Sequence, residues 1–261
     1  MKEVYNALKV EALLGIKSAF RYKVGIISDF LIFFSIYVIA VFFGSGGGFV
    51  SSYDATGVDG RVLVLIGVIF WQLSISALGF SSSLVSNSYA IGTLELRLQS
   101  KISPIILMFV NVIINLLTGV AILGIVLVVS YFYLDLSFND ILNIMSSFIV
   151  VLPSMLGMFG IGLMFGGLTL KEKSIGQFLM IIQGVLLFAS NSVIPLDNKI
   201  INLLPFPIGT DISRLIYLDE PISLGYISGY LLVNIGWLIV GVIIFNVMLR
   251  NERINGTFDT Y

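Results

Sequence analysis

Long apolar stretches alternate with short polar connections along this chain. Four stretches without a charged residue lie between Arg61 and Asp219, and two further apolar stretches flank them. About 20 apolar residues in a helix cross the roughly 30 Å hydrocarbon core of a bilayer. The pattern therefore predicts an all-α membrane protein with six transmembrane helices, at about residues 24–43, 62–84, 104–132, 142–168, 175–195 and 224–248.

The N-terminal segment, residues 1–23, is mixed polar and apolar. Its basic residues Lys9, Lys17 and Arg21 lie off a stripe of apolar positions three or four residues apart. That stripe consists of Tyr5, Leu8, Ala12, Ile16 and Phe20. The spacing favours an amphipathic helix on the cytoplasmic membrane surface, with its basic residues near anionic headgroups. A positively charged leader that only fixes the topology is the alternative.

Residues 194–223, before the last predicted span, combine four prolines with many apolar residues. Irregular backbone enters a membrane only where protein buries it or where it lines a cavity. We therefore expect two short re-entrant helices in this segment. Asp211 and Arg214 are three residues apart and are expected to pair on one helix face. An amphipathic loop on the outer membrane surface is the alternative.

The positions of the basic residues predict the orientation of the spans. Six spans put both termini on one side, which then holds eleven of the 14 lysines and arginines. Basic residues in short loops stay on the cytoplasmic side. The charges thus place both termini, including a tail at 249–261, in the cytoplasm. The composition agrees with a membrane protein, because 57% of residues are hydrophobic, 11% are charged and the mean hydropathy is +1.04.

The chain contains no cysteine and no histidine. Their absence excludes thiol nucleophiles, a serine and histidine dyad, thiolate metal sites and a zinc protease. The sequence also lacks the Gly-x4-Gly-Lys-Ser/Thr loop that binds nucleotide phosphates. These exclusions favour a transport or scaffold role without a catalytic or metal site, and they do not indicate a nucleic-acid partner.

The connection between the second and third predicted spans, residues 86–104, is apolar for a cytoplasmic loop. It carries Leu94, Leu96 and Leu98 beside charged side chains. A short amphipathic helix that docks onto a soluble partner satisfies both properties. Pro104 suits the first turn of the following span, where its missing N–H costs nothing.

This connection resembles the cytoplasmic loop of the ABC-2 family, the membrane subunits of one class of ATP-binding-cassette exporter. The likeness rests on the Gly92–Glu95 stretch, Gly-Thr-Leu-Glu, with Pro104 after it, and on the six-span plan with a cytoplasmic leader. Ser88, Tyr89, Ala90 and Ile91 stand where family members usually carry charged residues. An ordinary loop with a glycine turn is the alternative.

The resemblance implies a division of labour between chains. The membrane subunit works as a dimer, of two copies or of this chain with a sibling, and two separate ATPase subunits bind ATP and Mg. Residues 86–101 would then form a coupling helix seated on an ATPase. The implied contact residues are Tyr89, Gly92, Thr93, Leu94, Glu95 and Arg97.

The resemblance also implies an outer gate and a substrate pathway. The gate would contain Pro205, Pro207, Asp211 and Arg214. Spans two and five would face each other across the dimer axis. The polar and aromatic candidates for the pathway on these spans are Phe70, Trp71, Gln72, Ser74, Gln177, Gln183, Phe188 and Asn191. Without a charge at membrane depth, the pathway suits an amphipathic or lipophilic drug, lipid or peptide. Hydrogen bonding between helices is the alternative role of these amides.

Glycines crowd the fourth predicted span, where Gly162 and Gly166 have the small-x3-small spacing that lets helices approach closely. Packing within one subunit is favoured over a dimer seam. Taken together, the sequence predicts the permease subunit of an exporter in the inner or plasma membrane. An ATPase-independent secondary transporter or channel, or a membrane immunity or scaffold protein, is the alternative.

Overall fold

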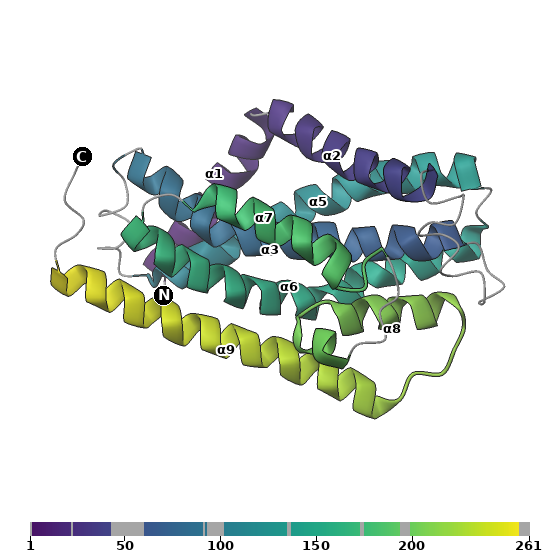
Figure 1. The fold of residues 1–261 in the computed structure, drawn as a ribbon. Coiled ribbons are helices and arrows are strands. Elements are labelled where there is room, and N and C mark those ends of the chain that lie inside the picture. Colours follow the sequence, from purple (N-terminus) through teal and green to yellow (C-terminus); the bar gives the residue numbers. More distant parts are fainter. Residues whose placement is uncertain are drawn as a thin grey trace.

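The computed structural model describes residues 2–21, 23–42, 60–90, 92, 102–134, 137–172, 175–193 and 199–255, and these are almost entirely helical (Figure 1). The long helices form a bundle, and two short helical segments lie beside the N-terminal half of the last helix. In chain order the elements are α1 (Lys2–Arg21), α2 (Lys23–Phe42), α3 (Gly60–Ala90), α5 (Pro104–Leu134), α6 (Phe138–Glu172), α7 (Gly176–Ala189), η2 (Lys199–Leu203), α8 (Pro207–Tyr217) and α9 (Leu224–Asn255).

Four of the described helices are long and apolar enough to cross a membrane. They contain Gly60–Ser88, Pro104–Phe132, Phe138–Glu172 and Leu224–Ile254, and shorter apolar helices cover Ile27–Ile39 and Gly176–Ala189. The all-helical membrane class predicted from the apolar stretches is therefore confirmed for the described part. The number of spans stays a prediction.

The predicted fifth span differs from the helix found there. Helix α7 has 14 residues, and at about 1.5 Å per residue it is roughly 21 Å long, shorter than the hydrocarbon core. It ends at Ala189 because Asn191 adopts a φ of 63°, which is incompatible with a continuing helix. The backbone then turns across α3 instead of extending as a helix to residue 195.

Helix starts follow local side-chain chemistry. Pro104 is the first residue of α5, as its missing N–H predicts. Before α6, the Ser137 hydroxyl donates to Asp140 Oδ2 at 2.7 Å and accepts from the Asp140 N–H at 3.2 Å. Ser223 accepts from the Tyr226 N–H at the start of α9. These caps satisfy N–H groups that have no partner within the helix.

Helix α6 packs between α3 and α9 through glycines. A Cβ added to Gly160 would lie 2.3 Å from the Trp237 carbonyl oxygen of α9. On the other side, a Cβ on Gly162 would lie 2.6 Å from the Leu78 carbonyl oxygen of α3, and one on Gly166 would lie 3.1 Å from the Ser81 side chain. The prediction that Gly162 and Gly166 pack within one subunit is therefore confirmed.

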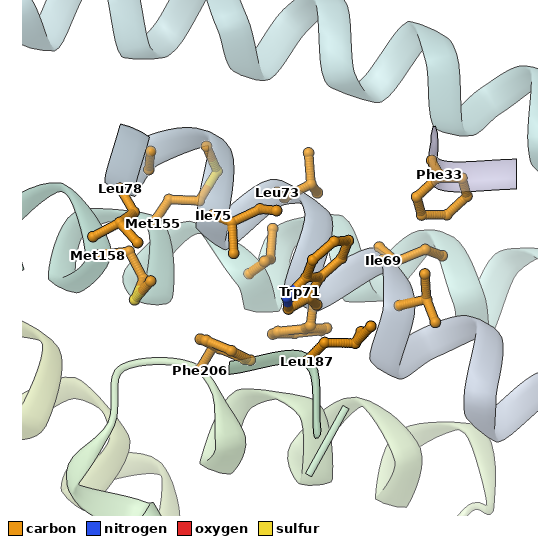
Figure 2. Close-up of a cluster of buried hydrophobic side chains, with 14 of the residues drawn as sticks. Phe33, Ile69, Trp71, Leu73, Ile75, Leu78, Met155, Met158, Leu187 and Phe206 are labelled. Atoms are coloured by element: carbon orange, nitrogen blue, oxygen red, sulfur yellow. The ribbon is translucent and has the colours of Figure 1, made fainter. Parts of the chain in front are cut away.

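Helix α3 is the most enclosed of the four long apolar helices. Within its most apolar window 83% of residues are buried, against 17% for α9. Its side chains supply much of the core, and Figure 2 shows Trp71 gathered with Leu187 of α7 and the buried Phe206. A helix buried on all sides is hydrophobic all round, which agrees with the unbroken apolar run in its sequence.

Helix α3 also runs past its predicted end at residue 84. It continues to Ala90 because it packs there against the end of α6, where the Ser82 and Thr169 hydroxyls lie 2.7 Å apart. Val85 and Leu170 are fully buried in the same region. Residues 86–90 were assigned to the connection by sequence, and the structure corrects this to the last helical turns of α3.

Helix α1 forms over the predicted amphipathic segment and packs on α5. The Asn111 side-chain amide donates to Glu11 Oε1 at 2.7 Å, and Gly15 lies against Ile114. Tyr5 of the predicted apolar stripe is 66% exposed. The face in contact with α5 thus includes the polar Glu11, which the apolar stripe alone did not indicate.

Candidate functional site

The predicted coupling residues follow directly from the end of α3. Tyr89 belongs to the last turn of this helix, and Gly92 is exposed with a φ of +70°. Glycine adopts this left-handed conformation without steric cost, and it commonly terminates helices in that way. Thr93, Leu94, Glu95 and Arg97 lie outside the described residues, so their role stays a prediction.

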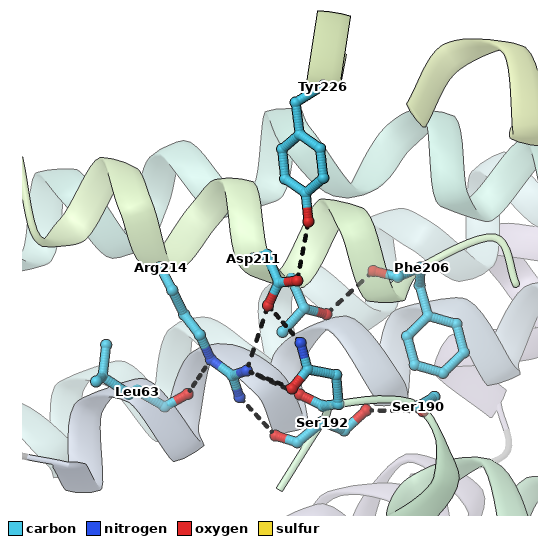
Figure 3. A network of polar contacts seen from close by, with 9 residues as sticks. Leu63, Ser190, Ser192, Phe206, Asp211, Arg214 and Tyr226 are labelled. Carbon is cyan, nitrogen blue, oxygen red and sulfur yellow. Dashed lines mark hydrogen bonds and ion pairs between the residues drawn. The ribbon is translucent and has the colours of Figure 1, made fainter. Parts of the chain in front are cut away.

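The opposite end of α3 contacts a buried arginine on α8. Arg214 is only 6% exposed. Its Nε donates to the Leu63 carbonyl at 3.1 Å, while Nη1 and Nη2 donate to the carbonyls of Asn191 at 2.8 Å and Ser192 at 2.9 Å (Figure 3). The planar guanidinium therefore joins α3, the segment after α7 and α8 at one point.

Asp211, one turn before Arg214 on α8, completes this polar cluster. Its Oδ1 lies 3.9 Å from Arg214 Nη1, so the ion pair predicted from their spacing is present. The Asn191 amide donates to the same carboxylate, and the Tyr226 hydroxyl of α9 donates to Oδ2 at 3.0 Å. Burial raises the pKa of the Asp211 carboxyl, while Arg214, Tyr226 and Asn191 oppose that rise.

Two backbone features let the segment after α7 reach α3. A Cβ on Gly67 would lie 1.7 Å from the Ser192 carbonyl oxygen and 2.6 Å from Arg214 Nη2. Only glycine therefore fits at this point of α3. Asn191 is left-handed with a φ of 63°, a conformation that asparagine tolerates better than most residues. We call Leu63, Gly67, Asn191, Ser192, Asp211, Arg214 and Tyr226 the Arg214 cluster.

Most of the Arg214 cluster was missed by sequence reasoning. Asn191 was assigned to the substrate pathway, and Leu63, Gly67, Ser192 and Tyr226 were not singled out. A glycine inside a long apolar span and an asparagine between two serines were the available signals. Neither indicates its partner without the tertiary structure, because the contacts join residues far apart in the sequence.

The four predicted gate residues lie in one segment, residues 199–217, which is hydrogen-bonded to α9. Pro207 begins α8, and the Pro205 carbonyl accepts from the Asn234 amide of α9 at 3.0 Å. Trp237 of α9 also donates from Nε1 to the Leu203 carbonyl at 2.7 Å. Together with the Arg214 cluster, these bonds hold both short helical segments against α9.

The predicted pathway residues are dispersed by the structure. Trp71 Nε1 donates to the Gln183 backbone carbonyl at 2.9 Å, so α3 and α7 meet within one chain. Whether they face each other across a dimer axis stays a prediction. Phe70 and Ser74 are fully buried, and the Ser74 hydroxyl lies 3.4 Å from that of Ser154 on α6. By contrast, Gln177 and Phe188 are exposed on α7.

Gln72 has a side-chain oxygen that is buried and without a hydrogen-bond partner among the described residues. Within the same part of the chain no group of three or more acidic, histidine or cysteine side chains is arranged to hold a metal ion.

The polar groups of the Arg214 cluster form hydrogen bonds with one another and thereby connect helices. The cluster therefore connects α3, the segment after α7, α8 and α9.

Comparison with known families gives one match. Residues 12–204 match the family described as ABC-2 type transporter, well over half of the chain. No curated protein matches the chain. The match covers the buried α3, the helices α2, α5, α6 and α7, the short η2, and α1 from residue 12 onward. This membrane-embedded chain therefore belongs to the ABC-2 type transporter family and is a permease of an ABC-type transporter.

Proposed function

We propose that the chain is the transmembrane subunit of an exporter driven by separate ATPase subunits. Two permease chains pair in the membrane, and two ATPases bind beneath them and supply the ATP and Mg chemistry. The cargo is an amphipathic or lipophilic molecule, such as a drug, lipid or peptide. The family match supports the permease role, and the following features support the coupling.

The observation that carries the proposal is the course of α3. One end of this helix leads into Gly92 and the predicted ATPase contact, and the other end bonds Arg214 through the Leu63 carbonyl. From Leu63 to Ala90 the helix is about 40 Å long. Because α3 is enclosed by its neighbours, a displacement of its cytoplasmic end is transmitted to the helices packed around it.

The distribution of charge supports the orientation. Arg250 and Arg253 lie at the C-terminal end of α9, far along that helix from the α8 contacts of its N-terminal half. Basic residues favour the cytoplasmic side, so the Arg214 cluster faces the outer side of the membrane. Residues 199–217 then form the outer gate, and both termini are cytoplasmic.

The proposed substrate pathway rests on two features of α3 and α7. The contact between Trp71 and Gln183 brings α3 and α7 together, and Gln72 offers an unpaired buried oxygen nearby in sequence. An apolar surface with a few amide groups binds lipophilic molecules and orients them by hydrogen bonds. Gln177 and Phe188 lie at exposed positions of α7, the side on which a second permease chain or cargo would approach it.

The proposal is tested by producing the chain together with a candidate ATP-binding-cassette ATPase subunit from the same organism. We expect the two to purify as one complex, with ATP hydrolysis measured in lipid vesicles. Leu94→Asp and Glu95→Ala should insert normally, yet Leu94→Asp should lower the ATPase rate at least about tenfold, because it places a charge in an apolar contact. Ser83→Ala, at an exposed position of α3 before the proposed ATPase contact, is the control.

Three outcomes would contradict the proposal. The ATPase subunit could fail to associate with the wild-type chain, or both coupling variants could hydrolyse ATP at the wild-type rate. Alternatively, vesicles holding the chain alone could move a lipophilic cargo, which would indicate a channel or secondary transporter.

A further inference from the structure

Helix α6 carries a proline in its interior. Pro153 lies near the middle of the 35-residue helix. A proline has no N–H for the carbonyl four residues earlier, and its ring crowds that carbonyl, which here belongs to Ile149. The adjoining backbone groups must then find other partners, and unpaired groups are especially costly in an apolar environment.

Tyr230 of α9 supplies that partner. Its hydroxyl accepts from the Ser154 N–H at 3.0 Å and donates to the Val150 carbonyl at 2.6 Å. In an uninterrupted α-helix these two groups bond directly to each other. The tyrosine hydroxyl is therefore inserted into the hydrogen-bond ladder of α6, one of the recognised causes of a helix kink.

The inserted hydroxyl is enclosed by α8. Tyr230 is 3% exposed and packs with Ile208 and Ile212 of α8, and Val150 of α6 lies against the same cluster. A Cβ added to Gly209 of α8 would lie 2.7 Å from the Tyr230 hydroxyl oxygen. Movement of α8 would thus act on the interruption in α6.

The two parts of α6 have different neighbours. After the interruption, Ser154 lies near Ser74 of α3, and the glycines from Gly157 onward pack against α3 and α9. Before it, Val150 contacts the cluster that α8 builds with Tyr230. Both parts contribute to the main core, since Ile144 belongs to it and Phe148 packs against it. The part before the interruption is in addition joined, through Val150, to the short helix of the Arg214 cluster.

We propose that α6 is a hinged helix that bends at Val150–Ser154, and that the Tyr230 hydroxyl holds the hinge in the present conformation. The hinge joins the outer segment to the helix core without passing through α3. This inference concerns the motion of the permease itself, and it stands whether or not an ATPase drives that motion.

The hinge is tested by measuring the distance between two nitroxide labels placed on either side of it. Asn139→Cys and Lys171→Cys put the labels at exposed positions about 48 Å apart on α6, and the chain has no cysteine of its own. Tyr230→Phe should broaden the distance distribution about twofold, because the released backbone groups no longer share one partner. Tyr226→Phe, one turn away on α9, removes the bond to Asp211 only and should keep the original width.

A second substitution distinguishes release of the α6 hinge from a general loss of helix packing. Pro153→Ala restores the missing N–H, so in the Tyr230→Phe background α6 can close its own ladder and the width should return to the original value. If the Tyr230→Phe variant does not fold, adding Pro153→Ala to it must restore folding. The proposal is overturned if Tyr230→Phe leaves the width unchanged, if Tyr226→Phe broadens it equally, or if Pro153→Ala rescues neither property.

Discussion

Arg214 illustrates why a charged residue is retained in an apolar protein. Its guanidinium donates to carbonyl groups on α3 and on the segment after α7, and it also faces Asp211. These acceptors lie in several directions around one plane, an arrangement that a lysine ammonium cannot reproduce. The residue therefore contributes mainly by fixing the relative positions of segments that are far apart in the sequence.

Arg214→Lys should destabilise the protein although it keeps the charge. The single ammonium group of lysine leaves some of the buried carbonyls without a donor, and we expect a cost of about 2–3 kcal/mol. The thermal unfolding midpoint in detergent should fall by roughly 5–10 °C. Arg250→Lys, at an exposed position near the end of α9, is the control. An equal midpoint for both variants would show that the cluster does not hold the fold.

At the scale of helices, the glycine seams of α6 determine the architecture. Gly160 and Gly241 allow α6 and α9 to approach until their backbones touch, since a Cβ on Gly241 would lie 1.9 Å from the Gly160 carbonyl oxygen. Association of helices in lipid depends on such close packing, because the hydrophobic effect does not favour helix contact over lipid contact. The seam therefore sets where α9 lies, and with it the position of residues 199–217, which α9 holds.

Gly241→Ala should separate α6 from α9. The added methyl group overlaps backbone, which cannot rotate away, so we expect a loss of about 1–3 kcal/mol in unfolding free energy. Gly236→Ala on the same helix adds a methyl group where nothing lies within 4 Å, and it should be neutral or slightly stabilising. Denaturation of the two variants side by side measures the difference. Equal stabilities would contradict a backbone contact at Gly241.

The elements differed in how far their sequence predicted them. Apolar length located the long helices, and Pro104 marked the start of α5 correctly. The end of α7 and the continuation of α3 to Ala90 depend on contacts with other helices, which apolar length does not reveal. The Asp211 and Arg214 pair followed from helical spacing, but the Arg214 bonds to Leu63, Asn191 and Ser192 reach backbone carbonyls, which carry no side-chain signature.

Across the whole molecule, three connected parts can be distinguished. The buried α3 runs from Ala90 to the Arg214 cluster, and α6 packs on it through glycines. Helix α9 holds residues 199–217 through Tyr226, Asn234 and Trp237. Few long-range bonds are needed for this arrangement because the helices themselves are stiff. The proposed transport cycle moves the outer part in response to the cytoplasmic end of α3.

The central claim is that ATP binding by a separate subunit, acting through the segment after Gly92, changes the outer end of the permease. The most direct measurement is the reactivity of Ile200→Cys toward a membrane-impermeant maleimide added from outside. Ile200 is 71% exposed on η2, and no native cysteine competes. We predict that trapping the complex with ATP and vanadate changes the labelling rate severalfold, and that Leu94→Asp abolishes this change. A labelling rate that is the same with and without ATP in the wild-type complex would contradict the account.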